Sequence, residues 1–227
     1  MDIVANIAEI QKRIATVCQN SGRDSADVRL VAVSKKKPAE DIEAAIAAGQ
    51  KLIGESYVQE CAAKIDEVKA NAEWHFIGAL QSNKVKYLRG KVAMIHSVDR
   101  LSLAKEIDRQ WGKDDDCVDI LIQVNLGEEA SKSGTTANEL IDLARQIAQL
   151  KHVRVKGLMA LPPWGADPEE VRPYFRQLRE LAEQIDALEL PNVAMQELSM
   201  GMSHDYEVAI EEGATLVRIG TAIFGAR

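Results

Sequence analysis

The sequence is poor in cysteine, in long apolar stretches and in net positive charge, and each shortage excludes a class of protein. Its three cysteines, Cys18, Cys61 and Cys117, are odd in number and lack the spacing of a disulfide framework or a zinc site. No apolar run approaches the roughly 20 residues of a bilayer-spanning helix, and the amphipathic start does not resemble a secretory signal. We therefore expect a cytoplasmic protein with buried, reduced thiols, no metal site and no membrane association.

Acidic residues outnumber basic ones. The 227 residues include 35 Asp and Glu against 28 Lys and Arg, which gives a formal net charge of −7. A field of this sign repels a phosphate backbone, so no nucleic-acid partner is expected. The 46% hydrophobic and 28% charged residues are typical of a soluble globular protein rather than of a disordered or collagen-like chain.

Short β-branched runs alternate with helical patterns along the chain. Residues 2–19 carry isoleucines at helical spacing and predict an amphipathic N-terminal helix. The run RLVAVS at 29–34 is typical of a strand that is covered on both faces. Helical stripes separate eight runs of this kind, which begin near residues 29, 51, 73, 92, 118, 153, 193 and 215.

Strands that are joined by helices are parallel, because a crossover helix is the usual link between neighbouring parallel strands. Eight such units predict an α/β fold: a single TIM barrel, (β/α)₈, over residues 1–227 with an extra N-terminal helix. An open doubly wound sheet is the alternative, but no Gly-x-Gly-x-x-Gly follows the first strand. In a barrel the active site lies at the carboxyl ends of the strands.

The residues that follow the predicted strands are suited to a carbonyl compound with an anionic group. Lys35 follows the first strand, where partial burial and two neighbouring lysines would favour the neutral amine that attacks a carbonyl. A surface charge is the alternative for this lysine. Backbone N–H groups in the loops after strands seven and eight of a barrel commonly bind phosphate. The candidate residues are Ser199, Met200, Gly201 and Ser203 at the end of the seventh strand, Gly220 and Thr221 after the eighth, and Ser56 after the second.

Two further polar residues lie within predicted strands. Arg218, in LVRIG, can turn its guanidinium into the barrel, or it can be buried in a structural ion pair. His75 is expected to be a hydrogen-bonded core histidine. No Ser-His-Asp or Cys-His arrangement is apparent, so no catalytic residue is assigned.

At these same positions the sequence resembles the YggS family, the pyridoxal phosphate (PLP) homeostasis proteins. The resemblance covers nearly the whole chain. It is carried, in order, by VAVSKKKP (31–38), IGESYVQE (53–60), WHFIGALQSNK (74–84), HSVDR (96–100), GLMALP (157–162), LSMGMSHDYEVAI (198–210) and VRIGTAIFGAR (217–227).

The resemblance implies a barrel like the amino-terminal domain of alanine racemase, with PLP as cofactor. It implies that Lys35 forms the Schiff base, that Arg218 lies near the pyridine nitrogen, and that the phosphate contacts Ser199, Gly220 and Thr221. Ser56 stands where the family usually has Asn, and Met200 belongs to the same strand end as Ser199. An arginine beside the pyridine nitrogen would keep it unprotonated and make the ring a poor electron sink.

Three functions remain open at this stage. The first, which the resemblance implies, is a PLP carrier or regulator without robust catalytic activity, which affects amino-acid and keto-acid pools indirectly and has PLP-dependent apoenzymes as candidate recipients. The second is a PLP-dependent amino-acid racemase, although 227 residues leave no room for the second domain that supplies its opposing tyrosine. The third is a barrel enzyme that acts on a phosphorylated metabolite without PLP. We expect a monomer, because a closed barrel needs no partner to complete it.

Overall fold

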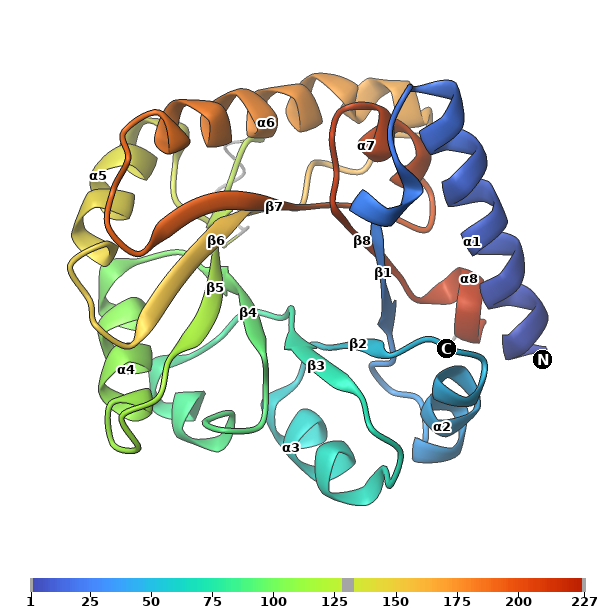
Figure 1. The fold of residues 1–227 in the computed structure, drawn as a ribbon, viewed down its shortest axis with the longest axis horizontal. Helices are drawn as coiled ribbons and strands as arrows, with labels where there is room; N and C mark the ends of the chain where they lie inside the picture. The colour runs from blue at the N-terminus through green and yellow to red at the C-terminus, as the bar shows by residue number, and fades with distance from the viewer. Residues whose placement is uncertain (1, 128–132, 226–227) are drawn as a thin grey trace.

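Eight parallel strands close into a barrel in the computed structural model, which describes residues 2–127 and 133–225. Each strand is hydrogen-bonded to its neighbours in the sequence, and the last strand pairs with the first (Figure 1). This closure confirms the predicted TIM barrel. The strands are β1 (Arg29–Val33), β2 (Leu52–Glu55), β3 (Glu73–Phe76), β4 (Met94–Val98), β5 (Val118–Val124), β6 (Val153–Ala160), β7 (Val193–Met202) and β8 (Leu216–Ile219).

Helices surround the barrel and connect its strands (Figure 1). A 3₁₀ helix, η2 (Ser82–Tyr87), links β3 to β4, and no helix in the described ranges is both long and apolar enough to cross a membrane. The other helices are α1 (Ile3–Asn20), η1 (Ser25–Asp27), α2 (Ala39–Ala47), α3 (Val58–Glu67), α4 (Leu101–Trp111), α5 (Ala137–Ile147), η3 (Pro168–Val171), α6 (Arg172–Asp186), α7 (Tyr206–Glu211) and α8 (Thr221–Phe224).

The N-terminal helix α1 lies outside the strand–helix repeat. Asp2 caps its first turn by accepting a hydrogen bond from the backbone N–H of Ala5. Its buried face, which includes Ile7 and Ile14, packs against α2, α7 and α8 (Figure 1). The helix therefore joins elements from both ends of the sequence.

The barrel has an apolar layer between strands and helices and a second apolar cluster of different residues. The second cluster takes one residue from each of six strands: Val31, Leu52, Met94, Leu121, Met159 and Leu216. In β3 and β7 the outer layer includes Phe76 and Met200, so alternation along each strand turns His75 and Ser199 inward. Both of these polar side chains are fully buried, which places a polar column inside an otherwise apolar barrel.

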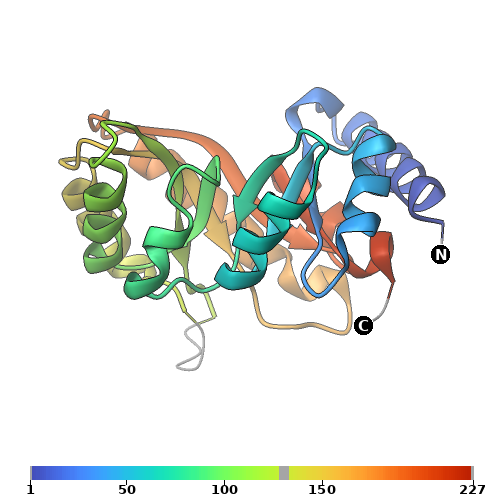
Figure 2. The same ribbon diagram turned by 90° about the horizontal axis from the view of Figure 1, so that it is seen from below.

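The carboxyl ends of the strands meet at one side of the molecule. The loops that follow β1 and β6 extend along this side, as does the C-terminal end (Figure 2). Pairing of β1 with β8 sets Val31 opposite Arg218. The first and last strands are therefore side by side, and their ends form adjacent parts of one wall.

Candidate functional site

A cavity of about 310 Å³ lies at the carboxyl ends of the strands. Six of the residues selected from the sequence line it: Lys35, Ser56, Ser203, Arg218, Gly220 and Thr221. The remaining lining residues are Val33, Ile77, Leu161, Met202 and His204. Residues from the two ends of the sequence thus converge on one cavity, as the barrel rule predicts.

Lys35 lies where three hollows adjoin. Besides the main cavity it lines a hollow of about 330 Å³ toward Tyr57 and Gln123, and a small one of about 40 Å³ toward Lys37 and Gly225. Lys35 is partly buried. Lys35 is therefore part of the cavity wall, and its role as a cofactor-binding residue stays a prediction.

The turn that carries Lys35 is held by contacts on both sides of it. Lys36 adopts a φ of +61°, a left-handed conformation that is uncommon for a residue with a side chain. The backbone N–H of Lys37 donates to the carbonyl of Ser34 at 3.0 Å, and Lys37 Nζ donates to the carbonyl of Phe224 at 2.6 Å. The last contact ties the turn to α8, whose first residue is Thr221.

A buried ion pair supports the same turn from the interior. Lys64 Nζ donates to Glu55 Oε1 and to the carbonyl of Ser34, each at 2.7 Å. The Ser34 hydroxyl donates to Glu55 Oε1 at 2.6 Å. Burial raises the pKa of Glu55 in spite of these donors. Residue Ser34, which precedes Lys35, is therefore fixed through both its side chain and its backbone.

The guanidinium of Arg218 is buried at the wall of the main cavity. It donates to Ser199 Oγ at 2.6 Å and to the carbonyl of Ala160 at 2.9 Å. Among the described residues its hydrogen-bond partners are a hydroxyl and a backbone carbonyl and not a carboxylate, so the structure does not show the alternative of a structural ion pair. Burial lowers the pKa of Arg218 to about 10, and the group stays cationic at neutral pH.

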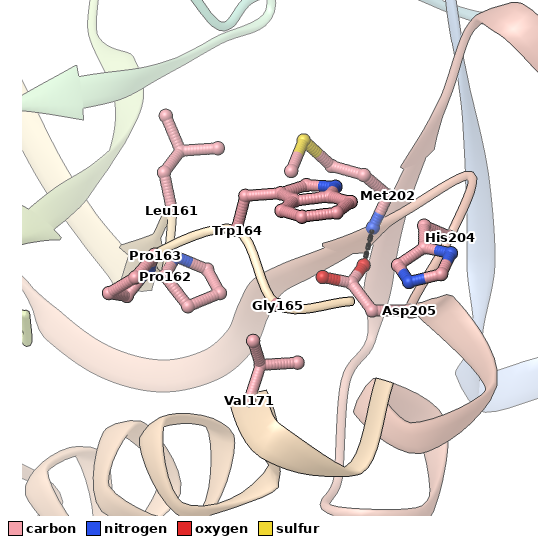
Figure 3. Close-up of a pocket in the computed structure, with 9 residues that line it drawn as sticks. All are labelled: Leu161, Pro162, Pro163, Trp164, Gly165, Val171, Met202, His204 and Asp205. Atoms are coloured by element: carbon pink, nitrogen blue, oxygen red, sulfur yellow. Dashed lines mark hydrogen bonds between the residues drawn. The ribbon is translucent and has the colours of Figure 1, made fainter. Parts of the chain in front are cut away.

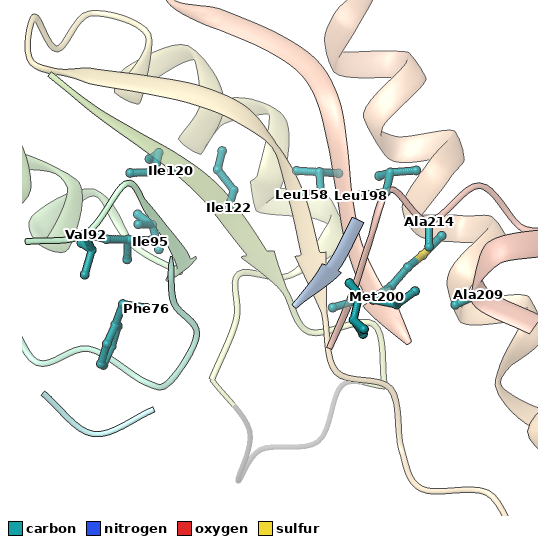
Figure 4. Packing of buried hydrophobic residues seen from close by; sticks show 14 of the residues in the cluster. Phe76, Val92, Ile95, Ile120, Ile122, Leu158, Leu198, Met200, Ala209 and Ala214 are labelled. Atoms are coloured by element: carbon teal, nitrogen blue, oxygen red, sulfur yellow. The ribbon is translucent and has the colours of Figure 1, made fainter. Parts of the chain in front are cut away.

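Ser199 and Met200 are not among the residues that line the cavity. The Ser199 hydroxyl lies within hydrogen-bond distance of Arg218 and of His96 Nδ1, the latter at 2.9 Å. Met200 is fully buried in the outer layer of the core, where Figure 4 draws it with Leu198 and Ala209. Alternation along β7 directs the Ser199 side chain into the barrel interior and that of Met200 toward the helices. That these two residues bind the cofactor stays a prediction.

The end of β7 and the loop that follows it bring Met202, Ser203 and His204 to the cavity. Gly201 makes this course possible with a φ of +88°, since a Cβ there would lie 2.6 Å from the Cβ of Ala209. The sequence predicts Ser203 as a candidate residue of this loop. Nothing in the sequence patterns singled out Met202 or assigned His204 to the site.

An adjoining apolar pocket of about 250 Å³ lies between the loops that follow β6 and β7 (Figure 3). Trp164 stacks on His204 with ring centroids 6.2 Å apart, and the indole is 80% exposed. Asp205 accepts a hydrogen bond from the backbone N–H of Met202 at 2.6 Å. The pocket shares Leu161, Met202 and His204 with the main cavity, so the two are continuous.

His75 is a fully buried histidine with a hydrogen-bond partner on each ring nitrogen, as predicted. Cys18 and Cys61 are buried and free, whereas the free Cys117 is partly exposed, which corrects the expectation that all three thiols are buried. Within residues 2–127 and 133–225 no three His, Cys, Asp or Glu side chains are grouped as metal ligands.

Comparison with known proteins shows the family to which the chain belongs. Residues 5–227 match the family described as alanine racemase, N-terminal domain. The pyridoxal phosphate homeostasis protein of Aquifex aeolicus is 47% identical over 228 residues, which cover 100% of this chain and 99% of that protein. The protein of that name from Escherichia coli K12 is 42% identical over 230 residues, which cover 100% and 97%.

Solved structures give the same result. PipY of Synechococcus elongatus PCC7942, solved with PLP bound, is 38% identical with a TM-score of 0.83, over 95% of this chain and 100% of PipY. Alanine racemase from Corynebacterium glutamicum, at 17% identity and a TM-score of 0.63, shares the fold over 96% of this chain and 60% of its own. The last of the resembling segments, 217–227, ends at residues 226–227, which lie outside the described residues. The chain belongs to the family of pyridoxal phosphate homeostasis proteins, whose barrel is the alanine racemase N-terminal domain.

Proposed function

We propose that this protein binds PLP reversibly in the main cavity and takes part in PLP homeostasis. One observation carries the proposal: the amine of Lys35 and the buried guanidinium of Arg218 line the same cavity, at the ends of two paired strands. The volume of about 310 Å³ is at the lower end of the range for ligand pockets, which suits a compact ligand with a single aromatic ring.

The lining residues fit the three chemical needs of PLP, which are an amine for the aldehyde, a partner for the ring nitrogen and an anion cradle for the phosphate. Lys35 is the proposed Schiff-base residue: its Nζ replaces the aldehyde oxygen, which leaves as water. Gly220 and Thr221 offer a backbone N–H and a hydroxyl to the phosphate, and Ser203 offers a second hydroxyl. Ser56 is the proposed polar contact beside Lys35.

Arg218 sets the character of the bound cofactor. When bound, PLP supplies an electron sink whose strength depends on a protonated ring nitrogen. A guanidinium can only donate, and it keeps its proton at ordinary pH, so it leaves the ring nitrogen unprotonated. The site is therefore suited to holding PLP more than to strong carbanion chemistry, which supports a carrier or regulator without robust catalytic activity.

The racemase alternative needs acid–base groups on both faces of a substrate carbon. Lys35 would serve one face, and His204 is the other titratable side chain on the cavity wall besides Arg218. We propose that His204 does not act as that second base, because its ring is stacked on Trp164 and its Nε2 is 3.2 Å from the carbonyl oxygen of Ala166. The proposal also includes a cytoplasmic monomer that affects amino-acid and keto-acid pools indirectly, with PLP-dependent apoenzymes as recipients.

The visible spectrum of the purified protein with PLP tests the proposal. The wild type should show the absorbance band of a PLP Schiff base, and borohydride should fix the cofactor to Lys35, as peptide mass spectrometry would show. Lys35→Ala should lose both signals. Lys36→Gln is the matched control, since it removes the neighbouring exposed lysine and should keep them.

Two further results would contradict the proposal. A wild-type protein that stays colourless with PLP and is insensitive to borohydride would favour a barrel enzyme that acts on a phosphorylated metabolite. Amino-acid racemisation well above background, lost in Lys35→Ala, would favour the racemase.

A further inference from the structure

A chain of hydrogen bonds runs through the barrel interior from the cavity to the opposite end of the strands. Arg218 Nη1 is 2.6 Å from Ser199 Oγ, and Ser199 Oγ is 2.9 Å from His96 Nδ1. His96 Nε2 is 2.8 Å from His75 Nδ1, and His75 Nε2 is 2.8 Å from Glu73 Oε1. Of these side chains only that of Glu73 reaches solvent, with 44% of it exposed.

The donors in this chain can point in only one direction. Arg29 Nη1 lies 3.4 Å from Glu73 Oε1, and the hydrogen bond from His75 is the main cause that lowers the pKa of Glu73, so this carboxylate is ionised and only accepts. A neutral His75 then donates from Nε2, which leaves its Nδ1 to accept from His96 Nε2. The Nδ1 of His96 accepts in turn from the Ser199 hydroxyl, whose oxygen accepts from Arg218.

This arrangement requires both histidines to be neutral, because an imidazolium has no acceptor nitrogen. Burial lowers the pKa of His75 and of His96. The charged groups that face the pair act in both senses: Glu73 and Glu197 favour a proton on His75, whereas Arg29 and Arg218 oppose protonation. The two rings lie with centroids 4.9 Å apart in the interior of the barrel, fully shielded from water.

The chain of hydrogen bonds reduces the electrostatic cost of burying Arg218 at the cavity wall. A buried cation without an ion-pair partner is costly, and hydrogen-bonded dipoles aligned toward it reduce that cost. Here the aligned dipoles begin at Arg218 and end on the carboxylate of Glu73. An arginine does not release its proton, so the chain does not deliver a proton to the cofactor. It fixes the charge and the direction of the guanidinium.

We propose that His75 and His96 are positioning residues that hold Arg218 toward the ring nitrogen of PLP, and that Glu73, at the far end of the barrel, sets the direction of the chain. This inference rests on the proposed function. Glu73 lies in a polar groove of about 440 Å³. The inference implies that a change in the charge of Glu73 alters cofactor binding at the other end of the barrel.

The substitution Glu73→Gln tests the inference without removing a buried group. A Gln amide can donate to His75 as well as accept from it, so the direction of the chain is no longer fixed. The probe is PLP labelled with ¹⁵N at the ring nitrogen. We expect its dissociation constant to rise about 5-fold or more and the ring ¹⁵N signal to become dependent on pH, whereas in the wild type the signal stays that of an unprotonated nitrogen.

Asp119→Asn is the matched control. Asp119 lies in the same groove and carries the same charge, but its carboxylate binds Arg154 at 2.6 Å instead of a histidine. This variant should bind PLP as the wild type does. Equal effects of the two substitutions, or no effect of Glu73→Gln, would overturn the inference.

A measurement on the cofactor-free protein separates this inference from the proposed function. The ¹⁵N spectrum of labelled histidine should show His75 and His96 as neutral rings protonated at Nε2. Any other tautomer, or an imidazolium at neutral pH, would refute the proposed direction of the hydrogen bonds even if PLP binds. If the wild type fails to bind PLP while both rings show the expected tautomer, the proposed function and the proposed role of the chain fall, but its direction stands.

Discussion

The ammonium nitrogen of Lys64 lies 2.7 Å from a carboxylate oxygen of Glu55, with both side chains almost wholly shielded from solvent. The pair joins β2 to α3, and Lys64 also holds the carbonyl of Ser34, the residue before Lys35. A second carboxylate, Glu60, lies 2.6 Å from the same ammonium and accepts from the backbone N–H of Lys36. The ion pair and the turn that carries Lys35 are therefore parts of one structural unit.

Replacing Lys64 with Met should destabilise the fold, because it leaves Glu55 buried without its counter-charge. We expect the free energy of unfolding to fall by about 3–5 kcal/mol at neutral pH. Urea denaturation followed by circular dichroism measures this change. Lys69→Met, at an exposed position after the same helix, should stay within about 0.5 kcal/mol of the wild type. A Lys64→Met protein as stable as the wild type would show that the pair does not stabilise the fold.

Gly201→Ala should disrupt the loop that brings Ser203 to the cavity. A methyl group there would have to tolerate a φ of +88° and would lie 2.9 Å from the Cα of Tyr206. We expect a loss of about 2–4 kcal/mol in unfolding free energy. Gly22→Ala is the control, since Gly22 has a φ of +70° but no atom within 4 Å of the added methyl group, and it should cost about 1 kcal/mol. Equal losses would mean that steric contact at Gly201 is unimportant.

Stability should depend on pH through the two buried histidines. Burial lowers the pKa of His75 and His96 below the ordinary value of 6.5, so the unfolded chain takes up protons first as the pH falls. The unfolding free energy should therefore decrease below about pH 6.5, by at most about 1.4 kcal/mol per histidine and pH unit, and should not depend on these groups above it.

Urea unfolding at several pH values measures this dependence. The raised pKa of Glu55 acts in the opposite sense, because that group binds its proton more readily in the folded state. His75→Gln and His96→Gln isolate the histidine contribution and should both flatten the acid slope. His152→Gln, at a partly exposed position, should keep it. If both buried-histidine variants keep the wild-type dependence of unfolding free energy on pH, the dependence does not come from His75 and His96.

Removal of the cofactor should lower the stability of the protein by mass action. At a free PLP concentration about 100 times the dissociation constant, binding adds about 2.7 kcal/mol to the unfolding free energy. Dialysis against an amine that captures PLP should therefore lower Tm, and fresh PLP should restore it.

In Arg218→Lys the shorter reach of a single ammonium group should weaken PLP binding at least about 10-fold. A PLP dissociation constant that is unchanged in this variant would show that Arg218 is not part of the binding site.

The fold was predictable because apolar runs and helical stripes alternate without interruption. RLVAVS and VDILIQVNL are too short and too rich in β-branched residues to be buried helices. The predicted barrel and the N-terminal helix are both observed, and Pro173 lies in the first turn of α6 as a proline in a helix start should.

The site was predictable in part. Strand ends select Lys35 and Arg218, which line the cavity, whereas Ser199, selected in the same way, does not line it. The register of β7 against β8 shifts between Ser199 and Met202, so the inward and outward positions do not follow a simple count to the end of the strand. The His75–His96 contact depends on the register of β3 against β4, which pairs His75 with Met94. A single sequence does not specify that register.

The pairing of β1 with β8 has a consequence for biosynthesis. Lys35 leaves the ribosome early and Arg218 late, so the wall that they share is assembled only when the final strand docks against the first. The coenzyme would then bind only after the barrel has closed, and a nascent or misfolded polypeptide would be unable to bind it.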